Sequence, residues 1–250
     1  NAAAILAMAK HEKITGSGRY LSWMQALAMG IEIFQDPLEG SFVHVLHPDS
    51  LEVKDSFRII YYDGEAAFAL MRLYELDKNP QWLNMVKKAF SFFIAQHYWK
   101  HKDHWLSYCS YELYRHLPEK EYLAFNLKNA EGILDFSLTR ETTFPTLLEL
   151  LMATHQMIQL AKERGDYPEI SSLFDEEKLN QAIEHRAHHQ LNGFFWPETA
   201  MYFKAPHHIL GSFYIRHHGF RVRIDDVEHN LSGYGQYFQH YASSMIGKED

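Results

Sequence analysis

The fold prediction rests on the stretch Tyr61-Tyr62-Asp63-Gly64-Glu65-Ala66-Ala67-Phe68-Ala69-Leu70-Met71-Arg72-Leu73-Tyr74-Glu75, because parts of it and of the segment after it recur 40 residues further along. The recurring pairs are Asp63 and Asp103, Leu73-Tyr74 and Leu113-Tyr114, and Trp82-Leu83 and Tyr122-Leu123. A period of roughly 40 residues with helical patterning inside each copy is typical of stacked helical hairpins. We therefore predict an all-α protein, an α/α toroid of helical hairpins with repeats of about 40 residues and minor β excursions.

Further helices are predicted on both sides of this repeat. Apolar residues at three- and four-residue spacing predict helices over 2–9, 20–34, 64–74, 81–96, 103–115, 122–136, 147–164, 175–190 and 227–241. Asp63, Asp103 and Asp225 stand at N-cap-like positions, and Thr142-Thr143 precedes the helix over 147–164 as a cap. Extended excursions are predicted over 38–60 and after Gly193. Since no Pro/Gly/Ser-rich linker interrupts the pattern, residues 1–250 are predicted to form one domain.

Composition narrows the class of protein. The chain has 250 residues, a formal net charge of −8 and 46% hydrophobic residues, which is ordinary for a folded soluble protein. Lys and Arg are scattered, which argues against nucleic acid or an anionic membrane as the main partner, and no apolar run is long enough for a membrane span. The single cysteine, Cys109, excludes an internal disulfide and favours a cytoplasmic location. Because the chain begins at Asn1 without an initiator methionine, we expect a processed chain or a fragment of a longer protein.

The toroid prediction places the functional site at the N-termini of the inner helices. These helices run roughly parallel, so their free N–H groups and partial positive charges gather on one rim, and the loops before them wall a central cleft. Acids, histidines, arginines and aromatic residues recur at this position. The candidates for proton transfer are Asp63, Glu65, Asp103, His104, Glu141, Asp226 and His229. The candidates for substrate binding are Tyr61, Tyr62, Trp105, Tyr108, Arg140, Arg223 and Asp225.

Each candidate also has a purely structural interpretation. An aspartate at an N-cap position usually only caps its helix. Aromatic residues at helical spacing belong to the core as often as they stack on a ligand. Asp226 is harder to explain in this way, because the adjacent Asp225 already suffices as a cap. With Arg223 and His229 nearby, the two aspartates are predicted to form a charge-tuned cluster.

The sequence contains no motif for a metal or a nucleotide cofactor. Adjacent histidines such as His207-His208 point in different directions, and no H-E-x-x-H or C-x-x-C spacing occurs. His185 and His189 have i, i+4 spacing, but on an expected outer helix this indicates a solvated or packed face. The chain also lacks G-x-G-x-x-G, P-loop and G-x-S-x-G motifs. We expect no metal and no cofactor, and we expect Cys109 to be buried.

The segment over residues 61–75, followed by Trp82-Leu83, resembles the hairpins of the α/α-toroid carbohydrate-active proteins. That group includes six-hairpin glycosidases, N-acylglucosamine 2-epimerase-like proteins and the helical domain of glucuronyl C5-epimerases. The resemblance covers residues 60–165 and 225–245 and concerns the fold pattern, so no catalytic pair is carried over. A sixth hairpin is not visible, and residues 165–224 depart from the pattern.

Two hypotheses follow. The first is an enzyme that acts on a carbohydrate by hydrolysis, elimination or epimerisation. A hydrolase would use two carboxyl groups, one as acid and one as base or nucleophile. A lyase or epimerase acting beside a uronic carboxylate would need Tyr or His for proton transfer and Arg to neutralise the carboxylate. The alternative is a non-catalytic helical-toroid domain that binds a peptide or a sugar, or serves as an accessory module of a larger protein.

Overall fold

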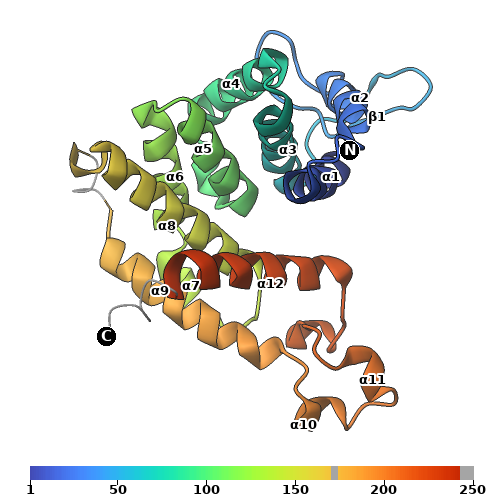
Figure 1. The fold of residues 1–250 in the computed structure, drawn as a ribbon, viewed down its shortest axis with the longest axis vertical. Helices are drawn as coiled ribbons and strands as arrows, with labels where there is room; N and C mark the ends of the chain where they lie inside the picture. Colours follow the sequence, from blue (N-terminus) through green and yellow to red (C-terminus); the bar gives the residue numbers. More distant parts are fainter. Residues whose placement is uncertain (170–173, 243–250) are drawn as a thin grey trace. The chain divides into compact units, whose positions relative to one another are not determined.

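A computed structural model describes residues 1–169 and 174–242, and the chain divides into two compact units (Figure 1). Unit 1 is Asn1–Asn129 and unit 2 is Ala130–Asp250. Helices dominate both units, which confirms the all-α class. None of the helices in the described ranges combines the length and the apolar character that a bilayer crossing demands. The interpretation of residues 1–250 as one domain stays a prediction.

Unit 1 consists of helices and one short β hairpin. The helices are α1 (Ala2–Thr15), α2 (Leu21–Glu32), α3 (Tyr61–Asp77), α4 (Pro80–Ala95), the 3-10 turn η1 (Tyr98–His101), α5 (His104–His116) and α6 (Lys120–Glu131), which continues past the unit boundary. The strands β1 (Val45–Leu46) and β2 (Val53–Asp55) pair antiparallel inside the predicted excursion. Asn79 caps α4, accepting the Gln81 N–H at 3.0 Å, and Pro80 fills the first helical position, where no N–H is needed.

Helix α3 packs against both α1 and α5, as Figure 1 shows. The α3–α5 contact is closest at Gly64 in the first turn of α3. A β carbon at this position would overlap Asp103 Oδ2 and would lie 2.9 Å from both the Leu106 backbone nitrogen and Trp105 Cβ. Only glycine therefore lets the two helix N-termini approach this closely.

The α3–α5 interface also pairs opposite charges at equivalent positions of the 40-residue offset. Arg72 and Glu75 in α3 correspond to Glu112 and Arg115 in α5, so the order of the charges is exchanged. Arg72 Nη1 lies 2.9 Å from Glu112 Oε1, and Arg115 Nη1 lies 3.7 Å from Glu75 Oε1. Burial raises the pKa of Glu75, but the hydrogen bond from Lys13 and the arginine charges outweigh it and lower the pKa to about 2. The exchange turns two similar segments into complementary partners.

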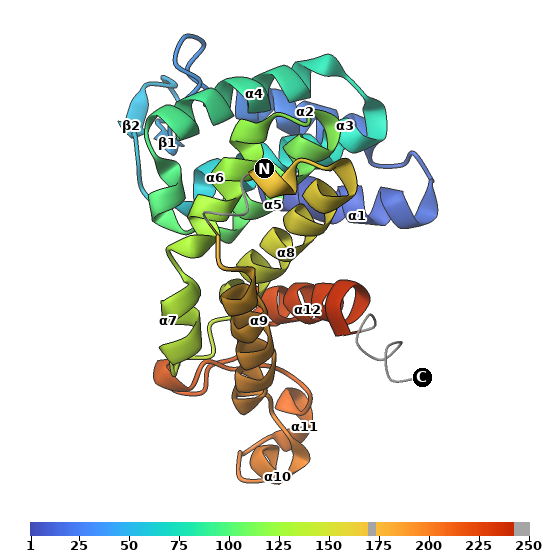
Figure 2. The ribbon, with the colours of Figure 1, turned by 90° about the vertical axis from the view of Figure 1, so that its left-hand side faces the viewer.

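Unit 2 is organised around α8. Its elements are α7 (Leu134–Thr139), α8 (Thr146–Arg164), η2 (Tyr167–Glu169), α9 (Glu176–Gln190), η4 (Leu191–Gly193), α10 (Pro197–Ala200), α11 (Pro206–Ile209), η5 (Arg216–His218), α12 (Ile224–Tyr237) and the π-helical turn η6 (Phe238–Ala242). Helix α8 packs against α9 and α12, and α7 packs against α9 (Figure 2). Asp175 caps α9, as its side chain accepts the Lys178 N–H at 2.9 Å.

Two predicted elements are wrong. The helix expected over 122–136 is interrupted at Gly132, where α6 has ended and α7 has not begun, because glycine is a poor helix former. The β excursion expected after Gly193 is absent from the described residues, which contain only isolated bridges there, between Phe194 and Phe213 and between Ile215 and Arg221. The aromatic residues of this segment instead form a small core. Its buried members are Phe195, Ala200 and Tyr214.

Three predicted N-caps are also wrong. Asp63 and Asp225 lie inside the first turns of α3 and α12, because these helices begin at Tyr61 and Ile224. Thr142-Thr143 does not cap α8, whose N-cap is Pro145. Both threonine hydroxyls are engaged elsewhere: Thr142 Oγ1 accepts from Arg140 Nε at 2.6 Å, and Thr143 Oγ1 donates to the Tyr214 carbonyl at 3.2 Å.

Substituting Gly64→Ala is expected to destabilise the protein by about 1–2 kcal/mol in urea unfolding, because overpacking at the α3–α5 contact exceeds the gain in helix propensity. The matched control is Gly235→Ala in α12, where an added β carbon has no neighbour within 4 Å. The control is expected to be neutral or to gain up to about 1 kcal/mol. Equal effects of the two substitutions would contradict the close approach at Gly64.

Candidate functional site

In unit 1, Asp63 and His44 form a buried pair. Asp63 Oδ2 lies 3.1 Å from His44 Nε2, and the side chains are 1% and 0% exposed. His44 Nδ1 accepts two backbone N–H groups, from Arg58 at 2.7 Å and from Ile59 at 3.2 Å. Since Nδ1 is an acceptor, the ring proton resides on Nε2 and is donated to Asp63. The segment before α3 therefore fixes both the tautomer of His44 and the orientation of Asp63.

Asp103 is the N-cap of α5, as predicted, and it is fully buried. Its carboxyl oxygens accept the N–H groups of Trp105 at 3.1 Å and Leu106 at 3.3 Å. Asn129 holds the backbone of Asp103 from α6, accepting its N–H at 3.2 Å and donating to its carbonyl at 2.8 Å. Burial raises the pKa of Asp103 to about 8 against the cap hydrogen bonds, and the negative charge of Asp63 adds to the rise.

The two aspartates therefore differ in chemical state. Asp103 keeps its proton at neutral pH, whereas Asp63 accepts a hydrogen bond from His44. A protonated carboxyl group beside a second carboxyl group is a known arrangement for proton transfer. Oδ1 of Asp63 is buried and has no hydrogen-bond partner among the described residues. Asp63 and Asp103 lie close enough for the charge of Asp63 to act on the pKa of Asp103.

The other candidates of unit 1 lie near Asp63 and Asp103 in sequence and structure. Tyr61 and Tyr62 are 40% and 39% exposed, and their rings lie 5.6 Å from His104 and 5.1 Å from His44, respectively. His104 is buried, with Nδ1 3.3 Å from Asp103 Oδ1. Three further candidates occupy the first two turns of α3 and α5. Glu65 and Trp105 are half-buried. Tyr108 is buried, and its ring stacks on that of Phe68 with 5.3 Å between the ring centres. Tyr108 thus has the environment of a core residue.

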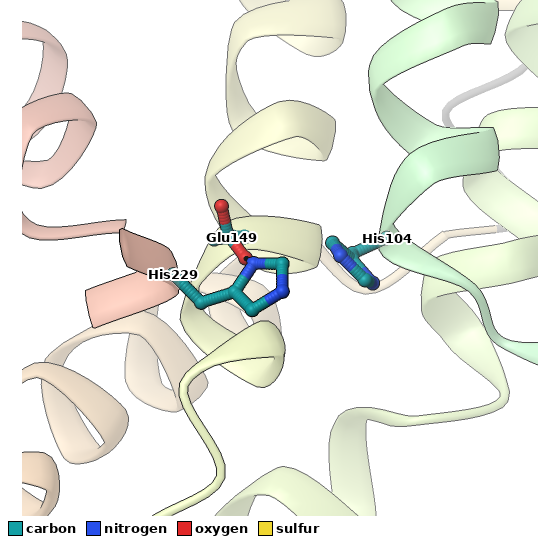
Figure 3. A group of neighbouring side chains, drawn as sticks. All are labelled: His104, Glu149 and His229. Atoms are coloured by element: carbon teal, nitrogen blue, oxygen red, sulfur yellow. Dashed lines mark hydrogen bonds and ion pairs between the residues drawn. The ribbon is translucent and has the colours of Figure 1, made fainter. Parts of the chain in front are cut away.

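In unit 2, His229 of α12 is bound to Glu149 of α8. His229 Nδ1 lies 2.7 Å from Glu149 Oε2, and Figure 3 shows the carboxylate directed at the imidazole ring. Glu149 is 1% exposed and the His229 side chain 17% exposed. Burial alone lowers the pKa of His229, but the hydrogen bond to Glu149 and the charges of Glu149, Glu228 and Asp226 outweigh it and raise the pKa. The raised pKa favours the charged, imidazolium form of His229 beside Glu149.

The other candidates at the start of α12 form an ion-pair cluster, as predicted. Arg223 Nε donates to Asp225 Oδ1 at 2.8 Å and lies 3.7 Å from Asp226 Oδ2. Asp226 is buried, and its carbonyl accepts from Asn230 Nδ2 at 2.8 Å. Arg223 is exposed and Asp225 is half-buried. The cluster fixes the first turn of α12, from which His229 follows one turn later.

Arg140 and Glu141 lie in the loop between α7 and α8. They line a cavity of about 370 Å³ together with Phe136, Thr139, Thr142 and His217. The predicted candidates thus fall into three groups, one in unit 1 and two in unit 2. Their gathering around one common cleft stays a prediction. Glu149 and His229 are side-chain types that zinc accepts, and the expectation that the protein binds no metal stays a prediction.

Comparison with protein-family models, with curated proteins and with solved structures finds no match for this chain. The resemblance to α/α-toroid carbohydrate-active proteins therefore depends on the sequence pattern alone.

Three functional candidates were missed by the sequence prediction: His44, Glu149 and Arg186. His44 accepts the backbone N–H of Arg58, and Arg186 donates to the backbone carbonyl of Arg140. Both partners are distant in sequence, so no local motif predicts these contacts. Glu149 stands in the first turn of α8, the position that the rim argument singles out, and could have been found there. Cys109 is buried, as predicted.

Asp103→Asn is expected to become more stable than the wild type as the pH rises. The folded-state pKa of about 8 lies above the unfolded value, so the wild type loses stability from about pH 4 up to pH 8, where the unfolded chain releases the proton first. Asparagine keeps one of the two cap acceptors and does not titrate. Between pH 5 and 8 the variant should gain more than about 1 kcal/mol on the wild type in urea unfolding. A difference that is independent of pH would contradict the raised pKa.

His229→Gln tests the unit 2 pair in the same way. Because the folded-state pKa is raised, the imidazolium–carboxylate pair stabilises the protein fully below the unfolded pKa, and the contribution is lost as the pH rises through the folded pKa. The unfolding free energy of the wild type should therefore fall more than that of the variant between pH 6 and 9. Parallel pH profiles would argue against the pair.

Proposed function

We propose that this chain is an enzyme that moves a proton on a carbohydrate substrate, by hydrolysis, elimination or epimerisation. The single observation that carries the proposal is the Glu149–His229 pair, in which a buried carboxylate holds a histidine at 2.7 Å. A histidine oriented by a carboxylate through Nδ1 is a recurrent proton-transfer unit in enzymes. Its raised pKa favours the role of general acid near neutral pH.

We further propose that the helix pairs α3–α4 and α5–α6 are hairpins of an α/α toroid. The support is their recurrence at an offset of 40 residues, together with the exchanged charges Arg72–Glu112 and Glu75–Arg115. In such a fold the N-termini of the inner helices face one cleft. Glu149, Asp103 and Asp63 each stand at or within one turn of such an N-terminus. The choice of a carbohydrate as substrate rests on the resemblance described above.

A second function is favoured by a different observation. Asp63 and Asp103 are 1% and 0% exposed, and Asp103 caps α5, so both carboxyl groups also suit a purely structural role. This burial supports a non-catalytic domain that binds a sugar or a peptide, or that serves as an accessory module. Both proposed functions require ligand binding, but only the enzyme would turn its ligand over.

The test of the enzyme proposal is turnover of 4-nitrophenyl glycosides and uronate-containing oligosaccharides by His229→Gln and Glu149→Gln. Loss of general acid–base catalysis is expected to lower kcat by about 10²–10⁴-fold. The matched control is His188→Gln in α9, which removes an exposed histidine 3.7 Å from Glu184 Oε2. The control should retain wild-type kcat.

Turnover that is unchanged in both variants would reject the assignment to this pair. Sugar binding by the wild type in a thermal-shift assay without any turnover would favour the non-catalytic domain, since a ligand of the folded state raises the melting temperature in either case.

A further inference from the structure

Two side chains of α9 bind the backbone of the loop that joins α7 to α8. Arg186 donates from Nη1 to the Arg140 carbonyl and from Nη2 to the Thr142 carbonyl, both at 2.8 Å. The carbonyl of Glu141, between them, lies 2.7 Å from His189 Nε2. Three consecutive carbonyl groups are therefore fixed, so the loop is a rigid support.

The Arg140 side chain is oriented by its own set of contacts. Its guanidinium carbon lies 5.3 Å from the centre of the Phe136 ring and 5.6 Å from that of Phe144, within the range of cation–π attraction. Nε donates to Thr142 Oγ1 at 2.6 Å. No described residue accepts a hydrogen bond from the two terminal nitrogens of Arg140. This arginine is exposed, lines the cavity of about 370 Å³ and is preorganised before any ligand arrives.

The two arginines at this loop form no ion pair within the described residues, although the acidic Glu141 also lines the cavity. Neither Arg140 nor the fully buried Arg186 has a carboxylate within ion-pair distance in the described part of the chain, and Arg186 Nε has no hydrogen-bond partner there. Burial lowers the pKa of Arg186 to about 10, and the nearby charge of Arg140 contributes to the decrease. Two guanidinium groups close enough to repel one another would be stabilised by an anion.

We propose that this cavity binds a small molecule whose carboxylate group pairs with the guanidinium of Arg140. The cavity is lined by Phe136, Thr139, Arg140, Glu141, Thr142 and His217. The two terminal nitrogens of arginine match the two oxygens of a carboxylate in a planar, bidentate pair. Phe136, 41% exposed, offers an apolar face to the rest of the ligand. The cavity volume suits a ligand of monosaccharide size.

The carboxylate class is favoured over phosphate because Glu141 also lines the cavity. One acidic side chain beside one arginine accepts a singly charged ligand, whereas a doubly charged phosphate would meet stronger repulsion. The carboxylate could belong to a sugar acid or to a simple hydroxy acid. This site shares no residue with the Glu149–His229 pair, so it stands whether or not the proposed enzyme activity is found.

The test is isothermal titration calorimetry of the full chain with glucuronate, lactate, glucose and inorganic phosphate. Wild-type protein should bind glucuronate or lactate, which each carry one carboxylate, and should not bind glucose, which lacks it. Arg140→Gln should raise the Kd at least tenfold, and Arg140→Lys should lose part of the affinity because lysine is a point charge without the planar fork. The substitutions should preserve the fold, since Arg186 holds the Arg140 backbone and not its side chain.

Arg19→Gln is the matched control, because Arg19 is an exposed arginine of unit 1 whose guanidinium lies 5.2 Å from the Tyr20 ring. It should bind as the wild type does, and so should His229→Gln. Whichever acid binds more tightly identifies the source of the carboxylate. Wild-type affinity in Arg140→Gln, absence of binding to both acids at millimolar concentration, or tighter binding of phosphate would each overturn the proposal.

Discussion

Burial of ionisable side chains is the constraint on which both units depend. A buried charge is tolerated only where polar groups compensate for lost hydration, so each such residue dictates the conformation of its surroundings. Asp63 fixes His44 and thereby the segment before α3, while Asp103 is enclosed by the first turn of α5 and by Asn129. In unit 2, Arg186 fixes the loop before α8 through two carbonyl groups. The residues of interest for function are therefore also those that hold the fold together.

The sequence predicted best what depends on local physics. Helical periodicity located α2, α4, α8 and α9 to within a few residues, and the cap Asp103 followed from the preference of aspartate for that position. Prediction from the sequence failed where a residue distant in the chain determines the local structure. Asp63 is a first-turn residue bound to a histidine 19 positions earlier, which an isolated N-cap pattern does not distinguish from a cap. The aromatic segment after Gly193 packs into a small core, although its composition equally suits strands.

The candidate site was predicted in part for the same reason. The rim argument selected Asp63 and Asp103, which are buried, and His229, which is half-buried, because helix N-termini attract acids and their partners. It could not identify the partners themselves, since His44, Glu149 and Arg186 reach their contacts across 14 to 80 residues of sequence. Nor could it separate a capping role from a catalytic one. Asp103 caps α5, and its raised pKa means that the same group also holds a proton at neutral pH.

The two groups of charged residues in unit 2, Glu149 with His229 and Arg140 with Arg186, differ in net charge. Glu149 and His229 compensate one another, so the pair is close to neutral overall and does not itself attract an anion. Arg140 and Arg186 lack such compensation, and their charge lies in a chain whose formal net charge is −8. A local positive site in an acidic protein selects strongly among ligands, because repulsion elsewhere on the surface discourages binding of the same anion at other places. An enzyme built in this way would separate recognition, by the fixed arginine, from chemistry, by the histidine, so that a substitution in one group would change affinity and a substitution in the other would change rate.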